Sequence, residues 1–454
     1  MLFLILFAGV LCVAFYSLFA ATCLTLVIRI LIPSFVRVPG ISLSLNAALC
    51  FSLLSLLLLR ELIGRKKTKD KTFFYPLVMG WVFFLLCLLF IPRDLPLALQ
   101  FSGWMKNTYT DLLLPVIVCF SVRNAWQVKR LCAILFGTVF IAGVYGIFTY
   151  VIKLNPYMIV MGLLANEPVS VTGMMSEVRG ALEGRIQSTL SHPLVWGQIV
   201  NVFFCFLLLM RCKRKLYLLL LAVLFLNLFL CGSRSVLLSG LMAIGLSVWQ
   251  IPFKKLFAYA LSGLVGLVVI LNVARQNDEL ALYVDTVEAT LFFWNQEKSD
   301  DIGVKGSSVS LRKDQLSGAF QLVGDCPLTG LGQGWIHNYQ VTKGLHPVML
   351  GFESVAYSKL VEIGMLGFVM WLAFYFRLYH KTVLFMKRHK VKYDVKIYFF
   401  PYFVSLLMTD SFESFYLFLV LIILLCKYVV FEESSDTVSY THLRAHETSA
   451  HLVC

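Results

Sequence analysis

Residues 2–32 read LFLILFAGVLCVAFYSLFAATCLTLVIRILI, and Arg29 is the one charged residue in that stretch. A run of roughly 18 apolar residues is long enough to cross a hydrocarbon core as a helix. This run is too long for a cleavable signal peptide and lacks a small-residue cleavage site, so it predicts a membrane span over residues 8–31. Because the run exceeds one span, we expect either a tilted helix or two short helices.

Similar runs recur along the chain. Of its 454 residues, 59% are hydrophobic and 14% are charged, and the mean hydropathy is +0.81. Soluble domains carry about 25% charged residues, so lipid must cover much of this surface. We expect an all-α integral membrane protein with about 12 transmembrane helices. The expected spans are 8–31, 41–60, 73–91, 108–122, 131–152, 193–210, 216–232, 236–251, 256–273, 355–376, 396–409 and 412–430.

Basic residues predict the orientation of these spans. More than half of the 39 Lys and Arg residues lie in five short loops, which all face one side if there are twelve spans. Positive loops stay in the cytoplasm, so we expect both termini on the cytoplasmic side. This pattern explains the net charge of +14 without nucleic acid, for which no aromatic-interleaved basic patch is present.

Two long connections then face outward, at about 153–192 and 272–354. Loops longer than about 15 residues are usually functional or disordered. The larger loop, between spans 9 and 10, holds amphipathic stretches (279–294, 311–323) and a turn-rich segment, so we expect short helices there. The eleventh span contains Pro401, and we expect it to be broken or packed inside the bundle.

Cysteines and the C-terminal segment do not indicate a site. Most of the twelve Cys residues lie in apolar runs, without a CxxC pair, and predict neither disulfides nor zinc. Residues 439–454 read SYTHLRAHETSAHLVC. They resemble an adapter-derived tail, so we expect them to be non-native and exclude their three histidines from the functional argument.

Two short polar segments lie at the outer ends of predicted spans. The segment RIQSTLSHP runs from Arg185 to Pro193, and an interfacial Arg with a helix-capping His192 is the alternative to a functional role. The loop GSRS (232–235) opens a helix, so Arg234 and Ser233 combine a cation with a helix N-terminus, which is a natural anion site. The alternative is a snorkelling arginine.

Two further segments belong to the larger outer loop. Arg312 lies in SLRK, upstream of PLTGLGQGW, where Gly332 and Gly334 permit a tight backbone path near a ligand. Glu353 precedes a span and is followed after ten residues by GMLG. It is either a catalytic carboxylate or a helix cap. We interpret Glu362 as structural, paired with Lys359, and consider the loop histidines His337 and His346 weaker base candidates than Glu353.

Together these segments resemble the O-antigen ligase and Wzy-type polysaccharide polymerase superfamily over about residues 180–430. Ligases of that family usually carry His, then Asn, Ser or Gln, nine residues and GxxG. Here the spacing is intact but Glu353 replaces the histidine, so the chain looks more like the polymerase branch. The pair His337-Asn338 resembles the ligase dipeptide but lacks the downstream glycines.

The resemblance implies an enzyme that takes a glycan from a polyprenyl-pyrophosphate donor. Arg234 and Arg312, with Arg185 next, would neutralise the pyrophosphate through forked hydrogen bonds. Glu353 would act as general base on an acceptor sugar hydroxyl, which predicts inversion at the anomeric carbon. No metal or cofactor is expected. The further substrate-binding candidates are His192, Ser233, Gly332, Gly334 and His337.

The expected organisation has four parts. They are N-terminal membrane helices (1–180), a ligase or polymerase-like membrane domain with its outer loop at 274–354 (181–430), a cytoplasmic tail (431–438) and the adapter-derived segment (439–454). Expected partners are the lipid-linked oligosaccharide and membrane lipids, with a chain-length regulator as a further candidate. A ligase acting on lipid A core, and a flippase for the same lipid, remain the alternatives.

Overall fold

The computed structural model describes residues 1–40, 43–63, 73–165, 178–179, 182–210, 215–249, 276, 281, 309–349, 352, 354–410 and 413–436. The predicted ninth span, Glu353 and residues 439–454 lie outside this set.

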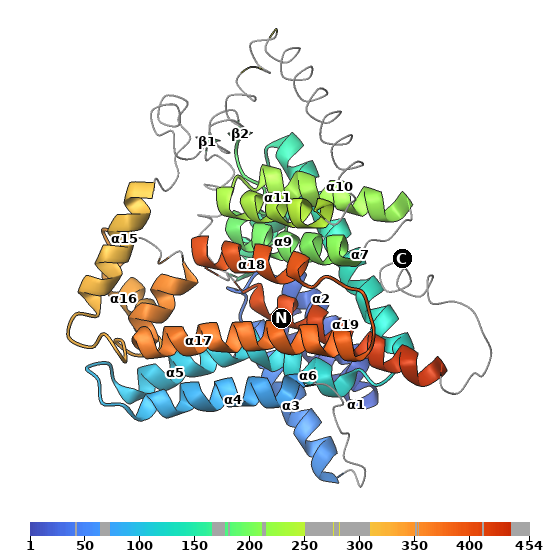
Figure 1. Cartoon of the computed structure of the whole chain (residues 1–454), viewed down its shortest axis with the longest axis horizontal. Helices are drawn as coiled ribbons and strands as arrows, with labels where there is room; N and C mark the ends of the chain where they lie inside the picture. The colour runs from blue at the N-terminus through green and yellow to red at the C-terminus, as the bar shows by residue number, and fades with distance from the viewer. Residues whose placement is uncertain are drawn as a thin grey trace.

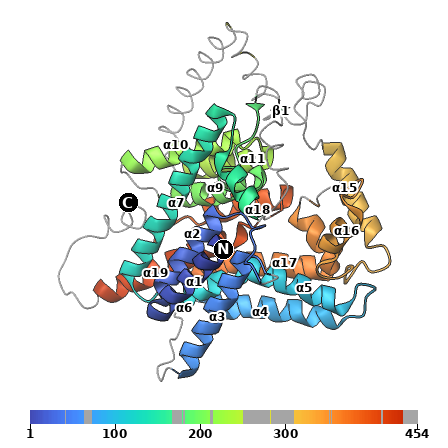
Figure 2. The same cartoon turned by 180° about the vertical axis from the view of Figure 1, so that it is seen from behind.

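Helices make up almost all of the regular structure in the described residues (Figures 1 and 2). They are α1 (Leu2–Tyr16), α2 (Leu18–Leu31), α3 (Leu45–Ile63), α4 (Phe74–Cys87), η1 (Leu88–Phe90), α5 (Leu97–Thr108), η2 (Tyr109–Leu113), α6 (Leu114–Ser121), α7 (Ala125–Ile152), α8 (Pro156–Ala165), α9 (Pro193–Met210), α10 (Lys215–Leu230), α11 (Arg234–Val248), α15 (Val309–Leu322), α16 (Trp335–Lys343), α17 (Val355–Arg388), α18 (Lys396–Met408) and α19 (Phe415–Asp436). The short strands β1 (Val178–Arg179) and β2 (Leu182–Glu183) pair antiparallel.

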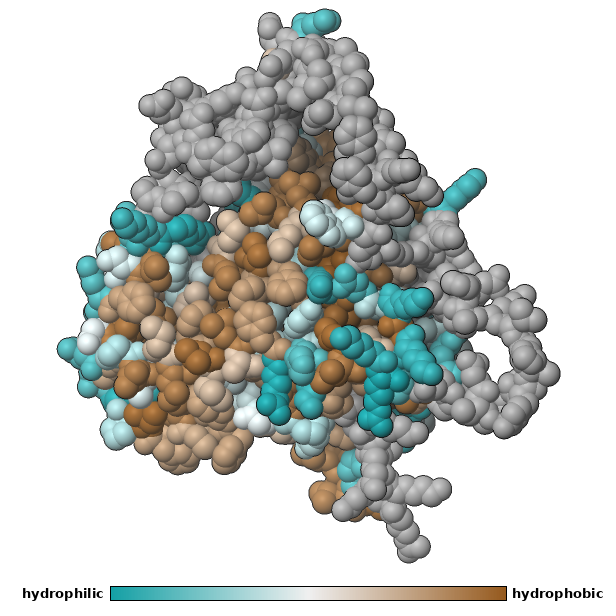
Figure 3. Space-filling model, in the orientation of Figure 1, coloured by the Kyte–Doolittle hydropathy of each residue, from teal (hydrophilic) through white to brown (hydrophobic). Residues whose placement is uncertain are grey.

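Five of the described helices are long and apolar enough to cross a membrane: α3, α7, α9, α17 and α19. Several other apolar helices are shorter. The chain is therefore a multi-pass, helical membrane protein, while the count of about 12 spans stays a prediction. In Figure 3, hydrophobic residues cover the middle of the visible face, and hydrophilic residues gather over α15 and α16 on the left and again towards the right.

The first apolar run forms two helices, as one of the two sequence interpretations anticipated. Ser17 is extended (φ −144°, ψ 105°) between α1 and α2. Its hydroxyl accepts a hydrogen bond from the Ala20 backbone N–H at 3.2 Å, which caps the second helix.

The predicted span at 108–122 has a more complex structure than one α-helix. The π-helical segment η2 joins α5 to α6, so the helical path begins eleven residues earlier than expected. Arg29, from α2, donates to the carbonyl oxygens of Tyr109 and Thr110 and lies 3.7 Å from the centre of the Tyr416 ring. The buried guanidinium thus satisfies carbonyl groups that a π-helical segment exposes.

The centre of the bundle is built around α18 and α19. Phe418 stacks on Tyr402 and Tyr398, with ring centroids 4.4 and 4.7 Å apart. The Ser239 hydroxyl from α11 donates to the Pro401 carbonyl at 2.6 Å. Pro401 therefore lies inside a buried helix, which confirms the expectation that this span packs within the bundle.

The described part of the larger predicted loop contains two short helices, as predicted. The amphipathic stretch 311–323 corresponds to α15, and α16 follows the glycine-rich turn. Both contact the N-terminal part of α17, and α16 also contacts α5. In Figures 1 and 2 they lie together at one end of the bundle, beside the beginning of α17.

Candidate functional site

A break in α17 organises this end of the molecule. Gly364 has φ 68° and ψ −174°, which is not helical and is accessible essentially to glycine alone. The chain direction changes there, and the neighbouring backbone groups need partners outside the helix.

The glycine-rich loop, residues 326–334, supplies those partners. The N–H groups of Leu331 and Gly332 donate to the carbonyls of Val361 and Glu362, at 2.8 and 3.0 Å. In the opposite direction, the N–H groups of Met365 and Leu366 donate to the carbonyls of Pro327 and Leu328, at 2.9 and 3.1 Å. The loop and the broken helix are therefore paired through their backbones.

Glu362 is fixed by the same loop. Its side chain is 9% exposed, and its Oε1 accepts a hydrogen bond from the Gly334 N–H at 3.0 Å. No ion pair joins Glu362 to Lys359 among the residues described here, so the expected pairing is absent. The carboxylate instead anchors the glycine-rich loop and faces a cavity.

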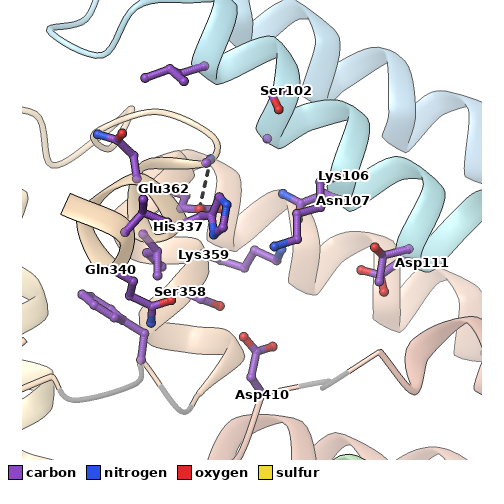
Figure 4. Close-up of a pocket in the computed structure, with 18 of the residues that line it drawn as sticks. Ser102, Lys106, Asn107, Asp111, His337, Gln340, Ser358, Lys359, Glu362 and Asp410 are labelled. Carbon is purple, nitrogen blue, oxygen red and sulfur yellow. Dashed lines mark hydrogen bonds between the residues drawn. The ribbon is translucent and has the colours of Figure 1, made fainter. Parts of the chain in front are cut away.

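The cavity has a volume of about 550 Å³ and lies between α5, η2, α16, the first turns of α17 and the loop that follows α18. Roughly 300–1,000 Å³ is typical of small-molecule sites. Figure 4 shows Lys106, Lys359, His337 and Glu362 around one side of the space and Asp111 and Asp410 on another. The remaining lining residues are mostly polar or small: Leu99, Ser102, Gly103, Asn107, Thr110, Gly334, Ile336, Asn338, Gln340, Val341, Phe352, Ser358 and Glu413.

Gly334 lines this cavity, and Gly332 precedes it in the same tight turn. Gly332 and Gly334 have φ of 114° and 84°, and a Cβ added to Gly334 would lie 3.1 Å from the Gly103 Cα. A Cβ added to Gly103 would be 2.5 Å from the Gly334 nitrogen. The expected tight backbone path is confirmed, and it brings the loop against α5.

Of the two predicted base candidates in the described part of the outer loop, only His337 lines the cavity. Its partial burial, together with the Lys106 ammonium, lowers the pKa of His337 from the ordinary value of 6.5. His346 instead caps a turn, since its Nδ1 accepts from the backbone N–H groups of Val348 and Met349 at 3.2 and 3.0 Å.

Arg185 and the GSRS loop are in contact, although 46 residues separate Arg185 from Cys231. The buried Arg185 donates from Nε to the Cys231 carbonyl at 2.9 Å. A Cβ added to Gly232, where φ is 63°, would lie 3.3 Å from the Arg185 side chain. Two of the predicted anion-binding segments therefore form one structure.

A hydrogen bond links this arginine-bearing structure to the loop that follows α18. Arg234 is the first residue of α11. The hydroxyl of the next residue, Ser235, is hydrogen-bonded to both Ser233, at 3.0 Å, and Thr409. Thr409 directly precedes Asp410, which lines the cavity.

His192 and Arg312 lie apart from the cavity lining. His192 Nδ1 accepts a hydrogen bond from the Leu194 N–H at 3.1 Å at the start of α9, which is the capping alternative. Arg312 donates to Gln315 Oε1 at 2.9 Å on α15, and its carbonyl accepts from the Tyr357 hydroxyl at 3.0 Å on α17.

Sequence reasoning missed several residues of the cavity. Lys106, Asp111, Asp410 and Glu413 belong to none of the segments that the sequence singled out. Within the described residues no group of three or more His, Cys, Asp or Glu side chains could hold a metal ion.

Comparison with known families identifies the central part of the chain. Residues 202–372, which run from within α9 to within α17, match the family model described as O-antigen ligase. This match covers less than half of the chain, and it supports the resemblance to the superfamily of membrane-embedded O-antigen ligases and polymerases. No curated protein matches the chain.

Proposed function

We propose that this protein is a polysaccharide polymerase of the O-antigen ligase superfamily. It transfers a glycan from a polyprenyl-pyrophosphate donor to a sugar hydroxyl of a lipid-linked repeat unit. The observation that carries the proposal is a polar cavity of about 550 Å³, with about half of its lining residues in the family-matched segment. A hydrogen bond between Ser235 and Thr409 links the arginine-bearing loop to the Asp410 loop of this cavity.

The arginines supply what a diphosphate leaving group requires. Arg185 and Arg234 belong to segments that contact each other, and the latter opens a helix whose N-terminus favours anions. Arg312 on α15 is the third candidate. Guanidinium groups form forked, charge-assisted hydrogen bonds with phosphate oxygens, so this chemistry requires no metal.

Glu353 is the proposed general base. A carboxylate that takes the proton of the acceptor hydroxyl raises the rate by about 10²–10⁴-fold. Attack on the side opposite the pyrophosphate would invert the anomeric carbon. The neighbouring Phe352 lines the cavity, and Ser354 donates to the Leu407 carbonyl at 2.6 Å just before the Asp410 loop.

The proposed location is the outer face of the bacterial cytoplasmic membrane, with both termini in the cytoplasm. The concentration of basic residues in alternate short loops supports this orientation. This orientation is tested by labelling single cysteines introduced at two exposed positions, Lys343 on α16 and Lys390 after α17. Labelling of the first from outside and the second only from inside is expected, and the reverse result would rule out an exported donor.

The direct test of the reaction uses purified protein with lipid-linked repeat units, without nucleotide or added metal. Longer lipid-linked glycans are the expected product. Glu353→Gln should remain folded and inserted but stop extension, whereas Asp325→Asn, an exposed carboxylate outside the cavity lining, should extend normally. Normal glycan extension by Glu353→Gln would show that Glu353 is not the general base.

Arg312→Lys tests the forked hydrogen bonds separately, because lysine keeps the charge without the fork. We expect at least a tenfold loss, on the order of 1.4 kcal/mol in the transition state. Arg388→Lys, at the distant end of α17, is the matched control. Unchanged turnover with Arg312→Lys would leave that arginine as a surface charge.

A ligase is the second candidate, because it uses the same donor chemistry and the family-model match carries that name. A glycan blot of a deletion strain separates the two. Single-repeat glycans still attached to the acceptor would indicate a polymerase, and lipid-linked polymer without attachment would indicate a ligase.

A further inference from the structure

The chemistry of the cavity wall suits a carbohydrate. The residues Asn107, Asn338, Gln340 and Ser358, with amide or hydroxyl side chains, line it beside several carboxylates. Sugar hydroxyls both donate and accept hydrogen bonds, so a wall of amides and carboxylates offers partners of both kinds.

One wall group lacks a partner that a sugar would provide. Asp111 lines the cavity, and its Oδ1 is buried without a hydrogen-bond partner in the part of the chain that the structure describes. A buried acceptor without a donor is unfavourable by about 1–3 kcal/mol. A ligand hydroxyl at this wall is a donor of the type that is missing.

The cavity and the arginine-bearing loop differ in charge. Four carboxylates line the cavity (Asp111, Glu362, Asp410 and Glu413), against two ammonium groups (Lys106 and Lys359). Lys106 is exposed, so solvent screens it more than the half-buried Lys359. A diphosphate would be repelled by this wall and attracted by Arg185 and Arg234 of the arginine-bearing loop, although the chain as a whole has a net charge of +14.

We infer that the cavity is the acceptor subsite and that it selects sugars without an acidic group, with amino sugars bound best and uronic acids bound worst. The inference rests on the proposed transfer to a sugar hydroxyl. It adds a substrate class that the family does not specify, since the carboxylates of Asp410 and Glu413 repel a second anion and attract an ammonium group.

Fragment binding tests this selection without turnover. The probes are the methyl glycosides of glucosamine, N-acetylglucosamine and glucuronic acid, titrated against the purified full chain by ligand-observed NMR. We expect the order glucosaminide, N-acetylglucosaminide, glucuronide from tightest to weakest. Glu413→Gln should reduce the ratio between the first and last affinities by about fivefold, and Asp410→Asn should act in the same direction.

The control is Asp325→Asn, which removes one negative charge from an exposed position outside the cavity and should leave the ratio unchanged. Equal affinity for glucosaminide and glucuronide, or no binding of any probe, would overturn the inference. An equal change in the ratio in all three variants would also overturn it, because net charge rather than the cavity would then set the preference.

The outcome is independent of the polymerase assay. If the sugars bind in the expected order but lipid-linked repeats are never extended, the subsite stands and the proposed reaction fails. If extension occurs with no preference among acceptors, the reaction stands and the proposed selection fails.

Discussion

Gly330 and Gly364 meet so closely that a Cβ added to Gly330 would lie 2.5 Å from the Gly364 backbone nitrogen. Both have positive φ, at 69° and 68°. The contact joins the glycine-rich loop to the break in α17 and leaves no space for a side chain at either position. The cavity wall at Glu362 therefore depends on two glycines from segments 34 residues apart.

Gly364→Ala should destabilise the protein strongly. The φ and ψ of this residue cost an L-residue about 1–3 kcal/mol, and the added methyl group would overlap the Leu328 carbonyl. A lower midpoint in thermal unfolding, followed by tryptophan fluorescence in detergent, is expected. Gly137→Ala, where an added Cβ meets nothing within 4 Å, should keep or raise the midpoint. Similar midpoints for the two variants would refute the account of the break.

Glu362→Gln and Glu362→Ala should behave differently. A glutamine retains an oxygen that can accept from the Gly334 N–H, so this variant should keep the stability and most of the turnover. The alanine variant leaves that N–H without its acceptor, which costs about 1–3 kcal/mol. Thermal midpoints and extension of lipid-linked repeats are the measurements. Loss of turnover in a fully stable Glu362→Gln would instead assign its charge a role in the chemistry.

Features set by composition or local spacing could be predicted from the sequence. The length of the first run allowed two helices as one of two alternatives, and the burial of the Pro401 helix was likewise one of two. The helix at 311–323 followed from amphipathic periodicity. The tight path at Gly332 and Gly334 followed from glycine spacing. The family resemblance over about 180–430 is supported by the match to residues 202–372.

Features set by tertiary packing could not be predicted. The break at Gly364 lies inside an apolar run, and its backbone partners come from another loop, so no periodicity marks it. The cavity combines Lys106 and Asp111 with Asp410, about 300 residues later. None of these residues belongs to a motif. Tertiary packing also decides that Glu362 accepts from the Gly334 backbone N–H rather than pairing with the nearby Lys359.

Arg93 should act as a positioning residue for the glycine-rich loop. Its guanidinium donates to the Thr329 carbonyl at 2.7 Å, to Gln100 Oε1 at 2.9 Å and to the Leu88 carbonyl at 3.1 Å. It thereby ties the loop to the connection between α4 and α5. Hydrogen bonds from charged groups contribute about 1.5–3 kcal/mol each.

Arg93→Lys keeps the charge but cannot reach three acceptors in the same geometry. We expect a higher KM for the acceptor with a smaller change in kcat, together with faster proteolysis within 326–334. Arg123→Lys, an exposed arginine after α6, is the control and should match the wild type. A loss in kcat alone with an intact loop would contradict a positioning role.

His337 should remain neutral to lower pH than an ordinary histidine. Burial, and secondly Lys106, lower its pKa from 6.5 in the folded protein. The unfolded chain therefore binds a proton first as pH falls, so the folded state loses stability between the ordinary pKa and the lowered one. Between about pH 7.5 and about pH 5.5, the thermal midpoint of the wild type should fall further than that of His337→Gln.

The contribution of Lys106 is tested by a histidine NMR titration in which the His337 signal is assigned with His337→Gln. Lys106→Gln should raise the pKa of His337. A pKa of His337 at or above 6.5 in the wild type would show that neither burial nor the ammonium group controls its charge.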